Sequence, residues 1–295
     1  TDDNARIEFL APLRVGVAGE STEQANVDAL LAHAGPAAPH LVGASPILFE
    51  DMAIAAIARG ETKRAEQLVL ESLALGETAR GRSILGELRA AAGRDEAALA
   101  EWQRAIALDP DDLATNLNLG KYYLGKNNLD GALAHLDRAA AAAPASARAR
   151  HLRGLVLQAS GADPSAVLDE LERARELDPA YTAEQPAFSL HYGRALRDVG
   201  RYDTALEPLE RYVEREPGDP IGHFDLGLLH LIAGDQALDA AAYKRAETSF
   251  LRALAIDPAF ADAHRALSLV YRKQGRIEEA DEEFDAFERY RKSWQ

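Results

Sequence analysis

One stretch of the sequence comes within one residue of a phosphate-binding loop. Residues 120–127 read GKYYLGKN, whereas the nucleotide signature G-x-x-x-x-G-K-[ST] ends in serine or threonine. A working loop follows a strand and opens a helix, so that free backbone N–H groups face the phosphate. Here the surrounding pattern places Gly120 inside a helix and Lys126 at its C-terminal end, where the helix dipole disfavours anions. We therefore predict that these glycines pack helices and bind no nucleotide.

The eight histidines are the next side chains that could do chemistry. His223 and His230 are seven residues apart and would share a helix face, and His264 holds the place equivalent to His223 later in the chain. These positions carry the residues that pack between paired helices, so we predict that the histidines have a packing role and bind no metal. The chain has no cysteine to complete a zinc site, no H-E-x-x-H and no G-x-S-x-G. We expect no catalytic residue, no metal and no cofactor, and hence no enzyme.

The elements that position these residues follow from an internal repeat. Stretches that end in proline recur at spacings of 34, 35, 38 and 41 residues, and they end at Pro110, Pro144, Pro179, Pro217 and Pro258. Before each proline lies a first glycine, at Gly86, Gly120, Gly154, Gly193 and Gly227. A second follows seven residues later, at Gly93, Gly161, Gly200 and Gly234, with Asn127 in one repeat. A small residue and then a large apolar one come next: Ala98 and Trp102, Ala132 and Leu136, Ala166 and Leu171, Ala205 and Leu209, Ala246 and Phe250.

Each of these residue types has a physical role in a pair of packed helices. The first glycine lets the two helices approach closely beside the large apolar residue. The second glycine, or Asn127, takes a left-handed conformation and ends the first helix. The proline ends the second helix, because the residue before it is pushed out of helical geometry. No pair can cover its apolar faces alone, so the pairs must stack.

These residues and spacings resemble the tetratricopeptide repeat family, in which each repeat is a pair of antiparallel helices. The resemblance implies an all-α fold, a right-handed α-solenoid of about seven helix-turn-helix repeats over residues 46–294. The predicted repeats are 46–78, 79–112, 113–146, 147–181, 186–219, 220–260 and 261–294. The first has Ala53 and Gly60 in the glycine places, and the last has Ser268 for its first glycine.

In this family the first helix of each repeat lines a concave groove, so matching positions predict a partner-binding surface. Its polar residues are Asn118, Lys121, Arg148, His151, Gln158, His191, Arg194, Arg197, Arg265 and Arg272, with Asp198 and Asp262 as acids. The sixth repeat instead presents Phe224, Leu228 and Leu231 beside Asp225. This apolar patch either faces a ligand or is covered by the segment around residues 236–243. The carboxylate clamp of chaperone-binding members is not expected, because Ser83, Glu87 and Leu152 occupy three of its places.

Charge bounds the class of partner. The chain has 33 basic and 48 acidic residues, a net charge of −15, which argues against nucleic acid and anionic membranes. A basic strip on so acidic a chain predicts a protein or peptide partner with acidic groups or a free carboxylate. A solvated face without a dedicated partner is the alternative. No apolar run is long enough to span a membrane, and we expect a cytoplasmic location, with the periplasm left open.

The two ends of the chain do not follow the repeat. Residues 1–12, TDDNARIEFLAP, resemble the tail of spermidine-synthase-like domains, with Ala5 in place of a proline. This implies a short strand, and an alternative role as the C-terminal regulatory or assembly region of a membrane-embedded relative. Otherwise residues 1–45 form an arm that caps the first repeat, with a helix at 24–35. At the other end an aromatic edge either packs inward or pairs with a second copy: Phe284, Phe287, Tyr290 and Trp294.

Together these patterns favour a non-catalytic interaction scaffold that binds its partner in the groove. The fused regulatory region is the first alternative. A repeat-fold enzyme with a groove active site is the second, and no motif supports it.

Overall fold

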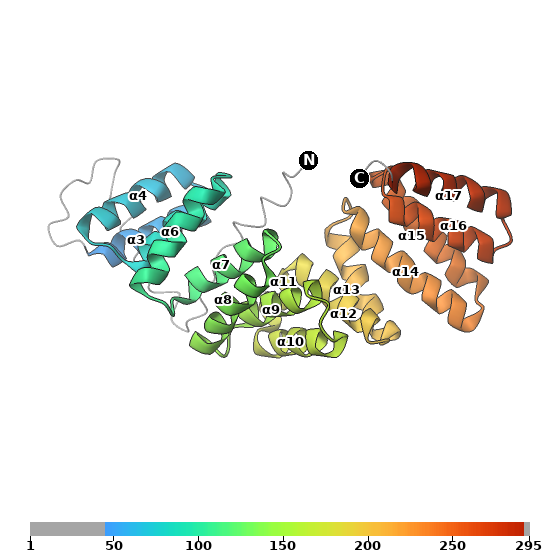
Figure 1. The fold of residues 1–295 in the computed structure, drawn as a ribbon, viewed down its shortest axis with the longest axis horizontal. Helices are drawn as coiled ribbons and strands as arrows, with labels where there is room; N and C mark the ends of the chain where they lie inside the picture. Colours follow the sequence, from blue (N-terminus) through green and yellow to red (C-terminus); the bar gives the residue numbers. More distant parts are fainter. Residues whose placement is uncertain (1–44, 292–295) are drawn as a thin grey trace. The chain divides into compact units, whose positions relative to one another are not determined.

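The computed structural model describes residues 45–291, and all regular secondary structure in that range is α-helical (Figure 1). The predicted all-α repeat fold is confirmed by these stacked helix pairs. The strand predicted near residue 9 and the helix predicted at 24–35 lie outside the described residues. The chain divides into two compact units, Thr1–Pro144 and Ala145–Gln295, which we call the N-terminal and C-terminal units. This division was not predicted, because the sequence pattern continues across it.

The described part of the N-terminal unit holds three helix pairs. They are α3 (Pro46–Ala58) with α4 (Thr62–Leu75), α5 (Ala79–Ala91) with α6 (Asp95–Leu108), and α7 (Leu113–Gly125) with α8 (Leu129–Ala142). The second helix of each pair packs against the first helix of the next, as α4 does against α5 and α6 against α7. The core therefore runs between helices along the stack, with Trp102 and Leu136 fully buried in it.

The described part of the C-terminal unit holds four helix pairs and one extra short helix. The pairs are α9 (Ala147–Ala159) with α10 (Pro164–Leu177), α12 (Pro186–Asp198) with α13 (Tyr202–Arg215), α14 (Pro220–Ala237) with α15 (Ala240–Ile256), and α16 (Ala261–Lys273) with α17 (Ile277–Arg291). The extra helix α11 (Pro179–Glu184) is inserted between the first two pairs and contacts both α10 and α12.

The first glycine of each repeat does what the pattern predicts. A Cβ added to Gly120 would lie 2.5 Å from Cγ of Leu136, and one added to Gly227 would lie 2.6 Å from the ring of Phe250. Real Cβ atoms do not approach so closely, so only glycine lets these paired helices meet. In each case the contacted residue is the large apolar residue predicted as the partner.

The second glycine has its predicted role in several repeats but not in the sixth. After α7, Asn127 takes a φ of 55° and the helix ends. Gly234, however, lies inside α14, which continues to Ala237 and ends where Leu238 adopts a φ of 51°. The prediction that Gly234 ends the helix is wrong. A Cβ there would lie 2.7 Å from the ring of Tyr243, so Gly234 instead allows α15 to pack closely.

Candidate functional site

The stretch that resembles a phosphate loop is part of a helix pair. Gly120 lies within α7, Gly125 is the last residue of that helix, and Lys126 follows as its C-cap. Nζ of Lys126 forms an ion pair with Oδ2 of Asp95 at 3.0 Å. Because these residues lie in α7 and at its cap, the backbone amides that a phosphate would need are already bonded within the helix, as predicted.

Two of the three histidines singled out in the sequence, His223 and His264, make hydrogen bonds to neighbouring protein groups. Nε2 of His223 donates to the carbonyl oxygen of Pro217 at 3.2 Å, and Nε2 of His264 donates to that of Pro258 at 3.0 Å. His223 is buried, and burial lowers the pKa of His230, with Arg245 adding to the effect. Over residues 45–291, no three His, Asp or Glu side chains come together in a way that could hold a metal ion.

Two predicted groove residues belong to the N-terminal unit, on α7. The amide of Asn118 is 4% exposed, and its Nδ2 donates to Oε1 of Glu87 on α5 at 2.6 Å. Lys121 lies one turn further along α7 and is half-buried. Asn118 is thus engaged with Glu87, one of the residues that departs from the carboxylate clamp.

In the C-terminal unit, hydrogen bonds join predicted groove residues that lie on successive first helices. His151 on α9 is buried; its Nδ1 lies 3.1 Å from the hydroxyl of Tyr181, and its Nε2 lies 3.2 Å from Nδ1 of His191 on α12. Burial lowers the pKa of His191 to about 4, with nearby Arg194 adding to the effect. Burial also raises the pKa of Tyr181 to about 12, so at neutral pH His191 and Tyr181 carry no charge.

A second group of bonds joins two arginines of α12 to a buried carboxylate on the next first helix, α14. Nε of Arg194 donates to Oδ2 of Asp225 at 2.5 Å, and Nη1 of Arg197 donates to Oδ1 of Asp225 at 2.6 Å. Asp225, on α14, has a side chain only 3% exposed. Arg197 also pairs with the neighbouring Asp198 at 2.9 Å. We call the two hydrogen-bonded groups together the polar network: His151, Tyr181 and His191, and Arg194, Arg197 and Asp225.

Asp225 was expected beside the apolar patch, and its pairing with the two arginines was not predicted. The available signal was a lone acid on an apolar helix face, one repeat after the two arginines. Arg148 and Gln158, the other predicted residues of α9, are half-buried. Within the described residues Arg148 forms no hydrogen bond or ion pair, and its charge lies close enough to act on Tyr181.

The predicted apolar patch of the sixth repeat packs largely into the core. Leu231 is 6% exposed, and Leu228 is partly buried in the same cluster. The ring of Phe224 lies 5.7 Å from that of Phe250 and 5.0 Å from that of Phe260. The neighbouring helices α15 and α16 therefore supply most of the contacts of this patch.

Arg265 and Arg272, predicted for the groove, lie against α17. Their guanidinium groups stand 6.0 Å and 5.9 Å from the ring centroids of Phe287 and Phe284. Tyr290 stacks on His264 with centroids 5.4 Å apart, whereas Phe284 is 41% exposed. Trp294 lies outside the described residues.

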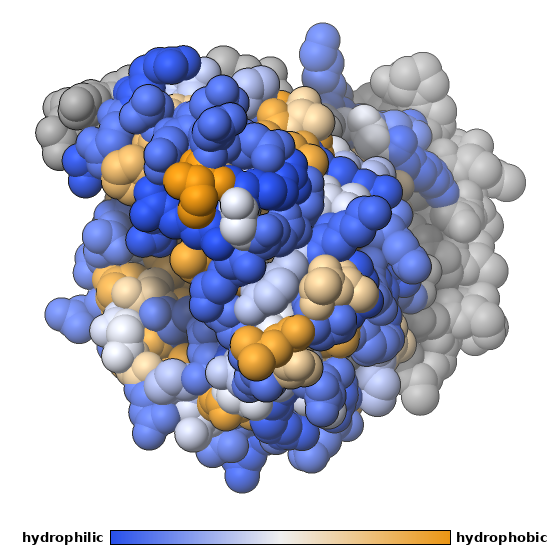
Figure 2. Space-filling model, turned by 90° about the vertical axis from the view of Figure 1, so that its right-hand side faces the viewer, coloured by the Kyte–Doolittle hydropathy of each residue, from blue (hydrophilic) through white to orange (hydrophobic). Residues whose placement is uncertain are grey.

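Figure 2, viewed from the right-hand side of Figure 1, shows a mainly hydrophilic surface with separate hydrophobic spots.

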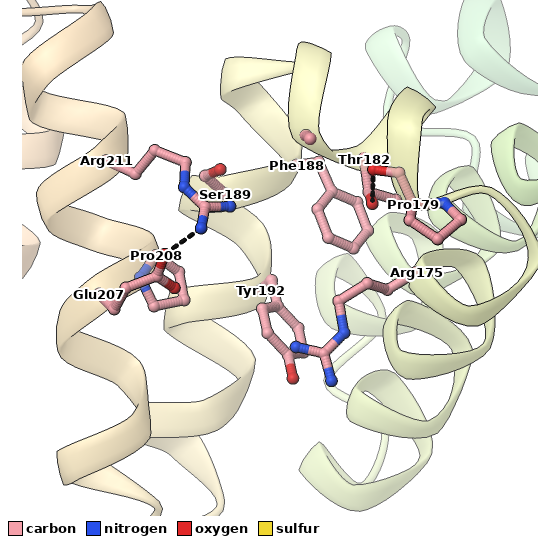
Figure 3. Close-up of a pocket in the computed structure, with 10 residues that line it drawn as sticks. Arg175, Pro179, Thr182, Phe188, Ser189, Tyr192, Glu207, Pro208 and Arg211 are labelled. Atoms are coloured by element: carbon pink, nitrogen blue, oxygen red, sulfur yellow. Dashed lines mark hydrogen bonds and ion pairs between the residues drawn. The ribbon is translucent and has the colours of Figure 1, made fainter.

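A pocket of about 190 Å³ opens elsewhere in the C-terminal unit, between α10, α11, α12 and α13 (Figure 3). It is lined by Arg175, Pro179, Thr182, Ala183, Phe188, Ser189, Tyr192, Glu207, Pro208 and Arg211. None of the predicted groove residues is among them. The guanidinium of Arg175 lies 4.9 Å from the centroid of the Tyr192 ring, and Arg211 is paired with Glu207. No motif in the sequence indicated this pocket.

Comparison with known protein families identifies the repeat independently. A family model described as tetratricopeptide repeat matches residues 117–182 and 193–250, and a second, described as TPR repeat, matches residues 86–127. No curated protein matches the chain.

Solved structures of several repeat proteins share the fold. YrrB, described as a TPR protein with an unusual peptide-binding site, is 23% identical and matches 64% of this chain and 91% of its own, with a TM-score of 0.51. PilW, a type IV pilus biogenesis factor, is 19% identical over 70% of this chain and 90% of its own, with a TM-score of 0.57. The matched chain of the APC/C hetero-tetramer Cut9–Hcn1 is 17% identical over 85% of this chain and 46% of its own, with a TM-score of 0.63. At such identities the likeness concerns the fold alone.

Proposed function

The chain belongs to the tetratricopeptide repeat family, and we propose that it is a non-catalytic scaffold that binds an acidic segment of a partner protein. The binding surface would lie along the first helices of the C-terminal unit, at Arg148, Gln158 and the polar network. The similar protein YrrB, with its peptide-binding site, is consistent with a peptide partner.

The observation that supports this most directly is the way in which Asp225 holds two arginines. Because one buried carboxylate accepts from both Arg194 and Arg197, their side chains are fixed before any ligand arrives. Ordering a long side chain on binding costs about 0.5–1.5 kcal/mol, so pre-ordered arginines bind more tightly. Arg194 is 28% exposed, and within the described residues only its Nε is bonded, which leaves both terminal nitrogens as donors.

The charges of this surface favour an acidic ligand moderately rather than strongly. Asp198 and Asp225 offset Arg194 and Arg197, and His191 is neutral, so Arg148 carries the uncompensated positive charge. A ligand carboxylate would therefore bond first to Arg148 and then to the outer nitrogens of Arg194. Charge-assisted bonds of this kind are about twice as strong as neutral ones.

Binding of peptides tests the proposal. On an array of acidic and neutral peptides, the protein should retain acidic sequences, and Arg148→Glu should weaken their binding by at least about tenfold, the loss of one charge-assisted hydrogen bond. The matched control is Arg173→Glu, an exposed charge reversal on α10 outside this surface. Acidic peptides that bind both variants equally well would exclude the surface as their site.

Three further predictions stay open. Among the helices over residues 45–291, none has the length and apolar character that a bilayer span requires, and the compartment remains a prediction. Self-association through the terminal repeats also stays a prediction, which sedimentation velocity would check. The resemblance to spermidine-synthase-like tails rests on residues outside the described range.

A further inference from the structure

The two helices of several repeats are joined by a polar pair at fixed positions. The fourth residue of the first helix bonds to the seventh residue of the second helix. The pairs are Arg82 with Glu101 at 2.7 Å, Asn116 with His135 at 3.0 Å, Arg150 with Glu170 at 3.4 Å, and His264 with Glu283 at 2.5 Å. The polar side chain at the fourth position, partly or fully buried, thus finds its partner within its own repeat.

The pair α12–α13 lacks this bond, because the two positions hold Ser189 and Pro208. Ser189 is 2% exposed, and its hydroxyl has no hydrogen-bond partner. Proline offers no side-chain group to accept or donate. A buried hydroxyl without a partner is unfavourable and rare in proteins, unless a ligand or water satisfies it.

The inserted helix α11 also removes a second hydrogen-bond partner, one that the fourth residue of the first helix uses in other repeats. In three repeats this residue donates to the carbonyl of the proline that closes the previous repeat, as Asn116 does to Pro110 at 2.9 Å and as His223 and His264 do. Before α12 the closing proline is Pro179, which starts α11, and its carbonyl accepts from Thr182 instead, at 3.1 Å. Ser189 therefore loses both partners through features special to this repeat.

The pocket of about 190 Å³ lies where these partners are missing, with Ser189 and Pro208 among its lining residues (Figure 3). A cavity of about 150 Å³ holds a benzene molecule, so this one has room for a single ring or branched side chain. The rings of Phe188, Tyr192 and Pro208 face the gap between the helices, and Arg175 reaches over Tyr192 from the opposite side.

We propose that this Ser189–Pro208 pocket binds the C-terminal residue of a partner protein, with an apolar ring inside and its carboxylate at the rim. The aromatic and proline walls would contact the ring. Arg175 is exposed and has no ion pair within the described residues, so its guanidinium, ordered by stacking on Tyr192, would bind the carboxylate.

This site is separate from the surface proposed for the acidic segment. The pocket takes its residues from α10, α11, α13 and the face of α12 that carries Ser189 and Tyr192. Arg148, Arg194 and Arg197 do not line it. Each proposal can therefore fail without the other.

Titration with small probes, followed by ligand-observed NMR, tests the chemistry. N-acetylphenylalanine should bind, and its amide should bind at least about tenfold more weakly, because the amide cannot form the charged bond with Arg175. N-acetylglycine, which lacks the ring, should show no binding. Equal binding of the acid and the amide, or no binding of either, overturns the proposal.

Two sets of variants, each with its own controls, locate the site without altering the core. Ala183→Trp fills the rim from an exposed position on α11 and should abolish binding, whereas Ala180→Trp, exposed on the same helix but outside the lining, should not. Arg175→Glu should weaken binding at least about tenfold, whereas Arg173→Glu and Arg148→Glu should leave it unchanged. Circular dichroism checks that each variant is folded. Binding that survives Ala183→Trp overturns the assignment.

A last comparison distinguishes a protein end from a free aromatic acid. A peptide that ends in phenylalanine with a free carboxylate should bind at least as tightly as N-acetylphenylalanine, and adding a glycine after the phenylalanine should abolish binding. If the small acid binds but the peptide does not, the pocket serves a small molecule and the proposed partner is wrong.

Discussion

At the scale of single residues, the bonds to Asp225 give Arg194 and Arg197 a role in stability besides their proposed role in binding. Its carboxylate is almost wholly withdrawn from water, and that desolvation is offset only because Arg194 and Arg197 both bond to it. A variant of either arginine therefore changes both ligand binding and the stability of the unit. This is why Arg148, which has no such bond, is the better probe of binding.

Replacing Asp225 should cost more stability than replacing its neighbour. Asp225→Ala leaves two partly buried guanidinium groups without their carboxylate, and we expect the free energy of unfolding to fall by about 3 kcal/mol. Asp198→Ala removes a carboxylate that is 35% exposed and pairs with Arg197. Its effect should stay below about 1 kcal/mol. Urea denaturation followed by circular dichroism measures both, and equal losses would contradict the structural role of Asp225.

His191 should make the C-terminal unit less stable in acid. Its pKa is about 4 in the folded chain against an ordinary value of 6.5, because of burial and then Arg194. The unfolded chain therefore binds a proton at His191 more readily than the folded chain does. The stability that the neutral His191 contributes is complete above pH 6.5 and is lost as the pH falls towards 4.

The variant His191→Gln, compared with the parent chain, isolates this effect. Between about pH 7 and pH 5 the parent should lose up to about 1.4 kcal/mol per pH unit through His191, and the variant should lose correspondingly less. The pKa values of His135 and His230 are also lowered, first by burial, so they act in the same direction in both proteins. Parallel pH profiles for parent and variant would rule out His191 as the source.

At the scale of elements, the local pattern predicted what a single helix pair determines. Gly120 and Leu136 meet because both lie in one pair, whose geometry follows from the repeat. The extra length of α14 was missed, since a glycine that ends a helix and one that admits the ring of Tyr243 look the same in sequence. The bond from Arg194 to Asp225 was missed for another reason: it joins two repeats, and its length depends on how they stack.

The two glycines of GKYYLGKN should respond oppositely to alanine. Gly120→Ala places a Cβ against Leu136 and forces α7 and α8 apart, which should cost about 1–3 kcal/mol of stability. Gly125→Ala meets no atom within 4 Å on the last turn of α7. It should stabilise the unit by up to about 1 kcal/mol, because alanine favours a helix. Thermal or urea unfolding measures both, and destabilisation by Gly125→Ala would refute the reading of this stretch as a plain helix end.

At the scale of the whole molecule, the residues discussed for binding and stability find their partners inside one compact unit. Asp225, Arg194 and Arg197 all belong to the C-terminal unit, whereas Gly120, Leu136 and Trp102 all belong to the N-terminal unit. In repeat arrays each repeat is stabilised mainly by its immediate neighbours. A substitution in one unit should therefore act on the unfolding of that unit.

Tryptophan fluorescence can test this independence. The chain has two tryptophans, and in a Trp294→Phe background only Trp102 remains, fully buried in the N-terminal unit. Asp225→Ala should then lower the urea midpoint seen by circular dichroism, by the loss of about 3 kcal/mol argued above, but leave the Trp102 midpoint unchanged. Gly120→Ala should lower the Trp102 midpoint. If Asp225→Ala lowers both midpoints together, the two units unfold as one cooperative block, and the effect of any substitution must be sought over the entire chain.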